Sequence, residues 1–200
     1  MRQFACAPYA VFGLLLLTPA FGVAADPAPV PSSAPLPAMQ LEPGLVFYDQ
    51  HGRVVKADAL LGKPTLLYFG YTFCPEVCPT TLAAMTQWMK MLGPDADRVN
   101  FVFVTIDPQR DTPKALRQFL SDFDPRIRGL TGSQTAIDTV TGAFQVYVKK
   151  VAFSGGDYAM DHSTSAFLLD KTGRFVEAFK YNVPNSQAVS QIRYMLQVYG

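Results

Sequence analysis

Two cysteines four positions apart, Cys74 and Cys78, can take part in more kinds of chemistry than any other residues in this sequence. Each is followed by a proline, in the segment YFGYTFCPEVCPTTL, which continues an apolar run. Thiolates are the nucleophiles of disulfide exchange and are also soft metal ligands. The pair therefore fits a structural disulfide, a redox-active dithiol or a metal site. A disulfide here closes a very short loop and would stabilise the fold little through chain entropy.

A third candidate ligand is His162, in the segment YAMDHSTSAFLLD just before an apolar run. The other histidine, His51, lies in the segment YDQHG, where a solvated turn residue is expected, and we assign it no function. Two thiolates and one imidazole suit Cu(I), Zn(II) or blue-type Cu(II). The alternative for His162 is a hydrogen-bonded histidine at a strand end. Only a fold that joins two distant loops could assemble the set.

The secondary-structure elements that must position these residues alternate between strands and helices along the chain. Continuous apolar runs at PTLLYFGY and NFVFVTI are typical of strands buried on both faces. After the cysteines, apolar residues recur at helical spacing, and Thr112 with Pro113, then Ser133, predict two further helix starts. The segments QVYVKKV, SAFLLD and RFVEAF are interpreted as strands, and a last helix follows them. This pattern predicts an α/β fold with a central sheet and helices on both sides.

The cysteine pair falls between the end of a strand at Tyr71 and the start of a helix near Pro79. In α/β folds, loops from distant segments meet at the carboxyl ends of the strands, so Cys74, Cys78 and His162 can converge there. Backbone N–H groups and the helix dipole favour anions at a helix N-terminus. We therefore expect lowered pKa values for both thiols.

The N-terminal segment, residues 1–25, predicts a signal peptide. Arg2 precedes a short apolar stretch around VFGLLLL, and the small residues of GVAAD supply a cleavage point. The apolar run is shorter than the roughly 20 residues that a membrane span needs, and an uncleaved anchor is the alternative. Residues 26–40 form a linker rich in Pro and Ala, and residues 41–200 form the globular domain.

The charge balance limits the classes of partner. Removal of Arg2 with the signal peptide would leave 16 Lys and Arg residues against 16 Asp and Glu residues. A neutral chain argues against nucleic acid or an anionic membrane surface as a partner. We predict an exported protein, either periplasmic or tethered to the outer face of the inner membrane by a retained leader. The compartment would be oxidising.

Three segments carry a resemblance to a known family: GYTFCPEVCPTTL, FVTIDPQRDTPKALRQF and MDHSTSAFLLDKTGRF. In composition, order and spacing they resemble the Sco/SenC family of copper-binding proteins, across nearly all of residues 41–200. The resemblance implies a thioredoxin-like α/β fold, with a central mixed sheet flanked by helices and with family-type insertions. By this resemblance Cys74, Cys78 and His162 match the family's copper ligands, for Cu(I) or Cu(II).

The resemblance also implies a function, namely a copper metallochaperone without catalytic turnover. It would deliver copper to the dinuclear copper centre of cytochrome c oxidase during assembly, with the copper-bearing oxidase subunit as partner. Other periplasmic copper chaperones or thiol reductases are further candidate partners. The alternatives are a thiol–disulfide oxidoreductase with Cys74 and Cys78 as its redox pair, or a redox or copper sensor. Thioredoxin-type reductases usually have Cys-x-x-Cys and a proline where HSTS stands here, which weakens the oxidoreductase alternative.

Five further residues have two interpretations each. If the segment YAMDH is extended, Met160 shares a face with the histidine and is either a weak copper ligand or part of the core. Asp161 either orients the imidazole or is solvated. Asp107, Arg110 and Asp111, which the family keeps, either dock a partner or fix a loop. Alternatively, Asp107 and Asp111 cap the turn and the next helix, with Arg110 as counter-ion.

Overall fold

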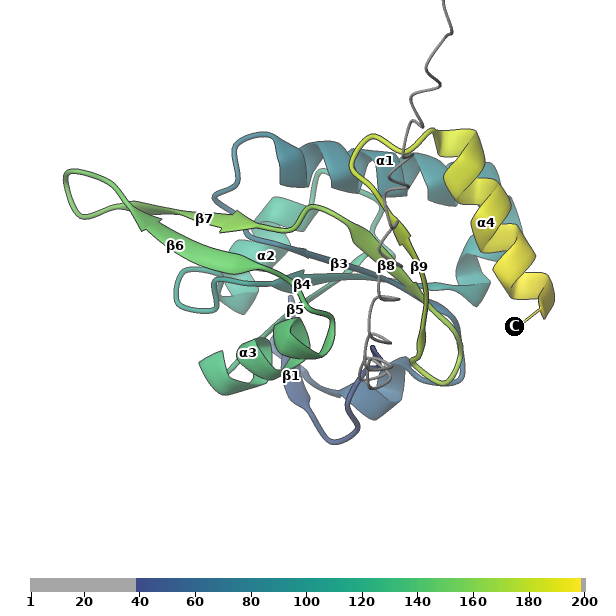
Figure 1. Ribbon diagram of the computed structural model, residues 1–200, viewed down its shortest axis with the longest axis horizontal. Coiled ribbons are helices and arrows are strands. Elements are labelled where there is room, and N and C mark those ends of the chain that lie inside the picture. The colour runs from purple at the N-terminus through teal and green to yellow at the C-terminus, as the bar shows by residue number, and fades with distance from the viewer. Residues whose placement is uncertain (1–38, 199–200) are drawn as a thin grey trace, which may run out of the picture. The chain divides into compact units, whose positions relative to one another are not determined.

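The computed structural model describes residues 39–198, so the predicted signal peptide and most of the predicted linker lie outside the described residues. Within this range a mixed sheet of seven strands forms the centre (Figure 1). Its strands are β1 (Val46–Asp49), β2 (Val54–Lys56), β3 (Thr65–Gly70), β4 (Asn100–Thr105), β5 (Arg128–Gly132), β8 (Ala166–Leu169) and β9 (Phe175–Phe179).

The strand order is β2-β1-β5-β4-β3-β8-β9. β3, β4 and β5 are parallel, and the other pairs are antiparallel. Parallel neighbours need crossover connections, which helices supply here. Gly70 at the end of β3 pairs with Thr105 at the end of β4. The loops that follow these two strands therefore leave from one edge of the sheet.

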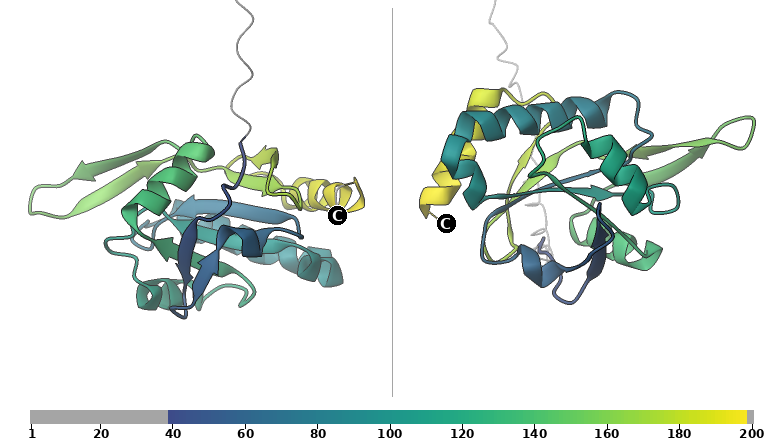
Figure 2. Two further views of the ribbon diagram at one scale, coloured as in Figure 1. Left: turned by 90° about the horizontal axis from the view of Figure 1, so that it is seen from below. Right: turned by 180° about the vertical axis from the view of Figure 1, so that it is seen from behind.

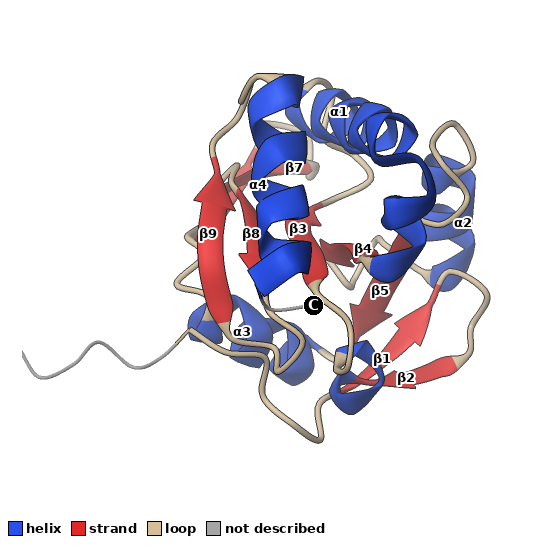
Figure 3. Ribbon diagram, turned by 90° about the vertical axis from the view of Figure 1, so that its right-hand side faces the viewer, coloured by secondary structure: helices blue, strands red, loops and turns tan. Residues whose placement is uncertain are grey.

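Helices cover both faces of the sheet (Figures 2 and 3). On β5, Gly129 faces Leu116 of α2, whereas Gly132 faces Ala136 of α3. Positions 129 and 132 differ by an odd number, so the two helices lie on opposite faces. α4 packs beside α1. The helices are α1 (Val77–Leu92), α2 (Pro113–Leu120), α3 (Gln134–Ala143) and α4 (Asn185–Val198), with short 3-10 helices η1 (Ala57–Leu60) and η2 (Gly93–Arg98).

Both predicted helix starts are confirmed. Thr112 Oγ1 accepts a hydrogen bond from the Ala115 N–H at 3.2 Å, and Ser133 Oγ accepts one from the Ala136 N–H at 3.1 Å. Each hydroxyl satisfies a backbone donor that the first helical turn leaves free. β5 is not predicted as a strand by the sequence analysis, because glycine occupies two of its positions and is depleted in strands. Pairing with β4 and β1 on its two sides holds this strand in place.

The strands β6 (Val148–Ala152) and β7 (Tyr158–His162) form a separate two-stranded antiparallel ribbon. This ribbon extends away from the central sheet (Figure 1). In its register Val148 pairs with His162, so the histidine lies at the base of the ribbon. The predicted strand QVYVKKV thus exists, but its partner is β7 and not a strand of the central sheet.

None of the helices within residues 39–198 combines the length and hydrophobicity that a membrane-spanning helix needs.

Candidate metal centre

The two cysteines straddle the start of α1. This helix begins at Val77, so Cys78 lies in its first turn and Cys74 in the loop before it. Cys78 is fully buried, and Cys74 is half-buried. A Cβ atom at Gly70 would lie 2.7 Å from Cys78 Sγ and 2.7 Å from the Phe103 ring. A glycine at the end of β3 is therefore required for the sulfur to pack directly against the strand.

A buried carboxylate fixes the loop that carries the cysteines. Asp111 accepts hydrogen bonds from the Thr72 N–H at 3.0 Å, from Thr72 Oγ1 at 2.6 Å and from Thr105 Oγ1 at 2.6 Å. Burial raises the pKa of Asp111, and these hydrogen bonds oppose that shift. Asp111 thus joins the loop after β4 to the first residues of the cysteine loop.

The two thiols differ in charge state. The Cys78 thiol donates to the Cys74 sulfur, which lowers the pKa of Cys74 to about 4. The Cys78 backbone N–H also points at Cys74 Sγ, at 3.3 Å, so the sulfur caps the N-terminus of α1. The same contact with Cys74, together with burial, raises the pKa of Cys78. The expectation of a lowered pKa is correct for Cys74 and wrong for Cys78, because the pair shares one proton.

We expect the alkylation rate of Cys74 by iodoacetamide to stay nearly constant as the pH falls from neutrality, and to drop only near pH 4. The thiolate is the nucleophile, and a lowered pKa keeps it ionised throughout that range. A Cys78→Ala variant, which lacks the hydrogen-bond donor, should shift the midpoint of the profile upward. Mass spectrometry of the labelled peptide measures the rate. A wild-type midpoint near an ordinary thiol pKa of about 8.5 would contradict the assigned charge state.

His162 presents one ring nitrogen to the cysteines. Its Nδ1 lies 2.7 Å from the Ser163 carbonyl oxygen, which can only accept, so Nδ1 carries the proton. The other nitrogen, Nε2, lies 3.8 Å from Cys78 Sγ. The Tyr71 ring packs edge-on against the imidazole, with centroids 5.9 Å apart. The ring is therefore oriented with its unprotonated nitrogen toward the sulfurs, as a neutral metal ligand requires.

The ligand atoms of Cys74, Cys78 and His162 all lie within 4.8 Å of one another. Sulfur and nitrogen ligands lie about 2.0–2.3 Å from a bound zinc ion, so two ligands of one such ion are about 3.5–4 Å apart. The 3.8 Å separation of Cys78 Sγ and His162 Nε2 matches this value. Two sulfurs and an imidazole form a soft donor set of the kind that suits copper. The three residues are thus positioned as a copper site.

Met160 and Asp161 precede His162 on β7. β7 is extended, so Met160 shares a face with His162, and Met160 packs against the hydrophobic core. A role for Met160 as a weak copper ligand stays a prediction. Asp161 is exposed and pairs in register with Lys149. The imidazole is oriented by the Ser163 carbonyl instead.

The hydrogen bonds and ion pairs described here for Asp107, Arg110 and Asp111 are formed with residues of the same chain. Thr112 caps α2, so neither carboxylate does. Asp111 fixes the cysteine loop, and Asp107 forms an ion pair with Arg110 at 2.5 Å. The loop-fixing role and the counter-ion role both hold. A role in docking a partner stays a prediction.

Three residues that shape the site were not identified in the sequence analysis. Tyr68 donates from its hydroxyl to Cys78 Sγ at 3.6 Å, and Thr72 donates from its hydroxyl to the Asp111 carboxylate. Tyr158 packs on Arg110. The alternation of β7 could have placed Tyr158 on the His162 face, because the two residues are four apart.

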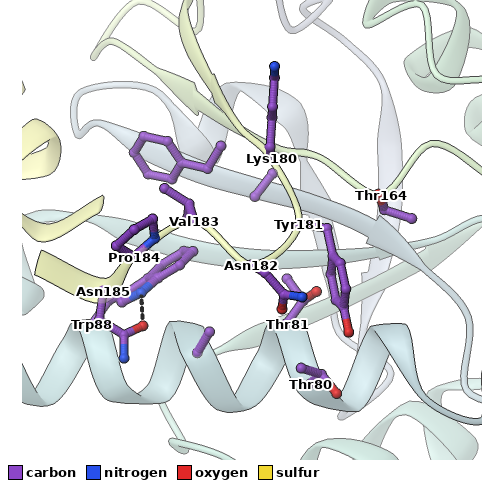
Figure 4. A pocket seen from close by; sticks show the side chains of 13 residues that line it. Thr80, Thr81, Trp88, Thr164, Lys180, Tyr181, Asn182, Val183, Pro184 and Asn185 are labelled. Carbon is purple, nitrogen blue, oxygen red and sulfur yellow. Dashed lines mark hydrogen bonds between the residues drawn. The ribbon is translucent and has the colours of Figure 1, made fainter. Parts of the chain in front are cut away.

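A pocket of about 240 Å³ lies beside the candidate metal centre and does not include it (Figure 4). Thr81, one helical turn after Cys78, and Thr164, two residues after His162, line it. Elsewhere in the pocket, Trp88 Nε1 donates to Asn185 Oδ1 at 2.7 Å, which joins α1 to α4. The three candidate ligands do not line this pocket.

Comparison with known proteins supports the motif resemblance. The sequence model of the SCO1/SenC family matches residues 35–197. The SCO2-like protein of Rickettsia conorii is 41% identical over 133 residues, or 66% of this chain and 65% of that protein. The chain therefore spans slightly less than two thirds of the length of that relative.

Solved structures of the same family share the fold. Bradyrhizobium japonicum ScoI with copper bound is 42% identical, with a TM-score of 0.71 over 76% of this chain and 96% of that chain. BsSco, a member of the Sco family of cytochrome c oxidase assembly proteins with a disulfide switch, is 27% identical, with a TM-score of 0.67 over 80% of this chain and 95% of that chain. The predicted thioredoxin-like α/β fold is confirmed. The chain belongs to the SCO1/SenC family.

Proposed function

We propose that this protein is a copper metallochaperone, which binds one copper ion through Cys74 Sγ, Cys78 Sγ and His162 Nε2. Copper is the cargo, and the recipient is the dinuclear copper centre of cytochrome c oxidase during its assembly. The observation that carries the proposal is the convergence of three soft ligand atoms within 4.8 Å. The copper-bound ScoI at 42% identity supports the choice of metal.

The burial of the three residues suits release as well as binding. Cys78 is fully buried, whereas Cys74 and His162 are half-buried, so the site has one closed side and one accessible side. Three protein ligands leave an ion with an open coordination position. A ligand of the acceptor can enter that position from the accessible side and replace the protein ligands one at a time.

A second candidate function is thiol–disulfide exchange, favoured by the hydrogen bond between the two cysteines. The Cys74 thiolate would attack a partner disulfide, form a mixed disulfide and release one partner thiolate. Cys78, losing its proton, would then attack Cys74 Sγ, close the Cys74–Cys78 disulfide and release the second partner thiolate. The partner gains the two electrons that the pair loses. Besides the contact with Cys74, burial raises the pKa of Cys78 and limits access to its sulfur, and both effects of burial disfavour this second step. A redox or copper sensor would use the same residues.

The proposed partner is the copper-bearing subunit of the oxidase, in line with the name of the family to which BsSco belongs. Other periplasmic copper chaperones or thiol reductases would load or reduce the site. Export to the periplasm, with or without a membrane tether, rests on residues 1–25, which lie outside the described residues.

The reduced protein should bind one copper ion per chain, and oxidation of the cysteines to a disulfide should release it. Disulfide sulfurs have no negative charge and are poor ligands. The measurement is metal analysis after gel filtration, before and after treatment with one equivalent of diamide, which takes up the two electrons and two protons. A Cys74→Ser/Cys78→Ser variant under the same treatment is the control. Full copper content after oxidation would place the ligands elsewhere.

A further inference from the structure

Arg110 occupies an unusual position beside the candidate metal centre. It follows β4, and its guanidinium lies 3.6 Å from the ring centroid of Tyr158 and 4.6 Å from that of Phe73. Tyr158 begins the ribbon strand β7, and Phe73 directly precedes Cys74. The side chain is only 16% exposed. One cation thus packs between the segment that carries the cysteines and the ribbon that carries the histidine.

Hydrogen bonds fix Tyr158 at both ends. Arg110 Nη1 donates to the Tyr158 carbonyl oxygen at 2.9 Å and to Asp157 Oδ1 at 3.1 Å. The Tyr158 hydroxyl donates to Asp107 Oδ1 at 2.9 Å, while Asp107 Oδ2 accepts from Arg110 Nε at 2.5 Å. We call Asp107, Arg110 and Tyr158 the arginine clamp. Planar guanidinium geometry allows simultaneous stacking and forked hydrogen bonding, which a lysine cannot supply.

Besides the clamp, Val148 and Met160 attach the ribbon to the body by packing against the hydrophobic core. β6 is exposed along most of its length, and its paired strand is β7. At the base of the ribbon, the Tyr147 N–H donates to Ser163 Oγ at 3.0 Å, and the Ser163 N–H donates to the Tyr147 carbonyl at 3.1 Å. These contacts lie at the base and in the middle of the ribbon, so its far end can still twist. The attachment at Tyr158, the end of β7 farthest from the base of the ribbon, removes this freedom.

The rotation of β7 decides where His162 points. Side chains on one strand face alternate with a period of two, so Tyr158 and His162 lie on the same face of β7. Clamping Tyr158 against the body therefore directs the His162 imidazole toward Cys78. We propose that Arg110 is a positioning residue for the metal centre, which holds His162 Nε2 within ligand distance of the cysteine sulfurs. This inference rests on the proposed copper binding.

The test is a double-mutant cycle on Cu(I) affinity, measured by competition with the chelator bicinchoninate. Arg110→Ala should weaken binding about tenfold, the size of effect typical of residues that orient a metal ligand. Arg110→Lys should recover only part of the loss. In the His162→Ala background, Arg110→Ala should cause no further loss, because the clamp acts through the histidine.

Two controls separate positioning from general stability. Arg126 is also an arginine paired with two carboxylates, Asp97 and Asp124, and Arg126→Ala should leave Cu(I) affinity unchanged. In the metal-free protein, Arg110→Ala should accelerate amide hydrogen exchange in β6 and β7 and leave β3 and β4 protected. Should Arg110→Ala not fold, Tyr158→Leu removes the same clamp from the ribbon side, with the same expected loss.

An equal loss of affinity from Arg110→Ala in both backgrounds would overturn the inference, since the effect would then not pass through His162. Unchanged affinity in a folded Arg110→Ala or Tyr158→Leu variant would overturn it as well. Failure of the proposed function gives a different pattern, in which His162→Ala alone leaves Cu(I) affinity unchanged.

Discussion

The Cys78→Ser variant is expected to lose tight Cu(I) binding, with affinity reduced by about two orders of magnitude or more. A hydroxyl is a hard, neutral group and does not replace a soft thiolate on Cu(I). Cys78 is fully buried, so water has little access to fill the vacated coordination position. Serine retains a hydrogen-bond donor toward Cys74, so the remaining thiolate keeps that contact and the change isolates the lost ligand.

The measurement is chelator competition under strictly reducing conditions, with thermal unfolding recorded on the same sample. Cys74→Ser should cause a comparable loss. Met160→Leu is the matched control, because Met160 precedes His162 by two residues on β7 and packs against the core. Affinity in Cys78→Ser equal to that of the unmodified protein would remove this cysteine from the ligand set and with it the copper site proposed here.

The second large effect is expected for His162→Ala, which should separate copper delivery from thiol exchange. Loss of the imidazole leaves the ion with two thiolates and should weaken Cu(I) binding by about tenfold to a hundredfold. Disulfide exchange needs only a nucleophilic thiolate and an accessible partner disulfide. The variant should therefore keep most of its reactivity toward a disulfide probe. Some change in rate is expected, since the imidazole lies within 4.8 Å of the Cys74 sulfur and its removal changes the surroundings of the thiolate.

Both properties should be measured in one preparation and compared with oxidase activity in cells that lack the native protein. A copper chaperone predicts loss of copper-centre assembly in His162→Ala together with near-normal thiol reactivity. His51→Ala is the control, because that histidine lies in the exposed turn between β1 and β2. If His162→Ala lacks copper and still supports full oxidase assembly, thiol chemistry is the function and delivery by this site is wrong.

The local structure of much of the fold could be predicted from the sequence. The apolar runs of β3 and β4 are buried strands, and Thr112 and Ser133 begin helices as expected. These features depend on contacts within a few residues, namely side-chain alternation and capping hydrogen bonds. The identity of the three candidate ligands also came from the sequence, because it depends on residue type and motif spacing.

The elements that sequence reasoning missed or left unpartnered are those that depend on distant partners. β5 contains two glycines and is a strand because β4 and β1 pair with it on either side. β6 pairs with β7 in the ribbon, and the residue pattern of a single strand does not identify its pairing partner. In both cases long-range hydrogen bonding outweighs local preference.

The chemical character of the site was decided by the tertiary structure. Sequence patterns suggested equal thiols, whereas the shared proton lowers the pKa of Cys74 and raises that of Cys78. The Arg110 hydrogen bond to the Tyr158 carbonyl joins residues 48 positions apart. Charge state and ligand direction depend on distances of a few ångströms between segments far apart in the chain. Residue type determines which ligand atoms are present, and only the packed fold determines their protonation and the direction in which they point.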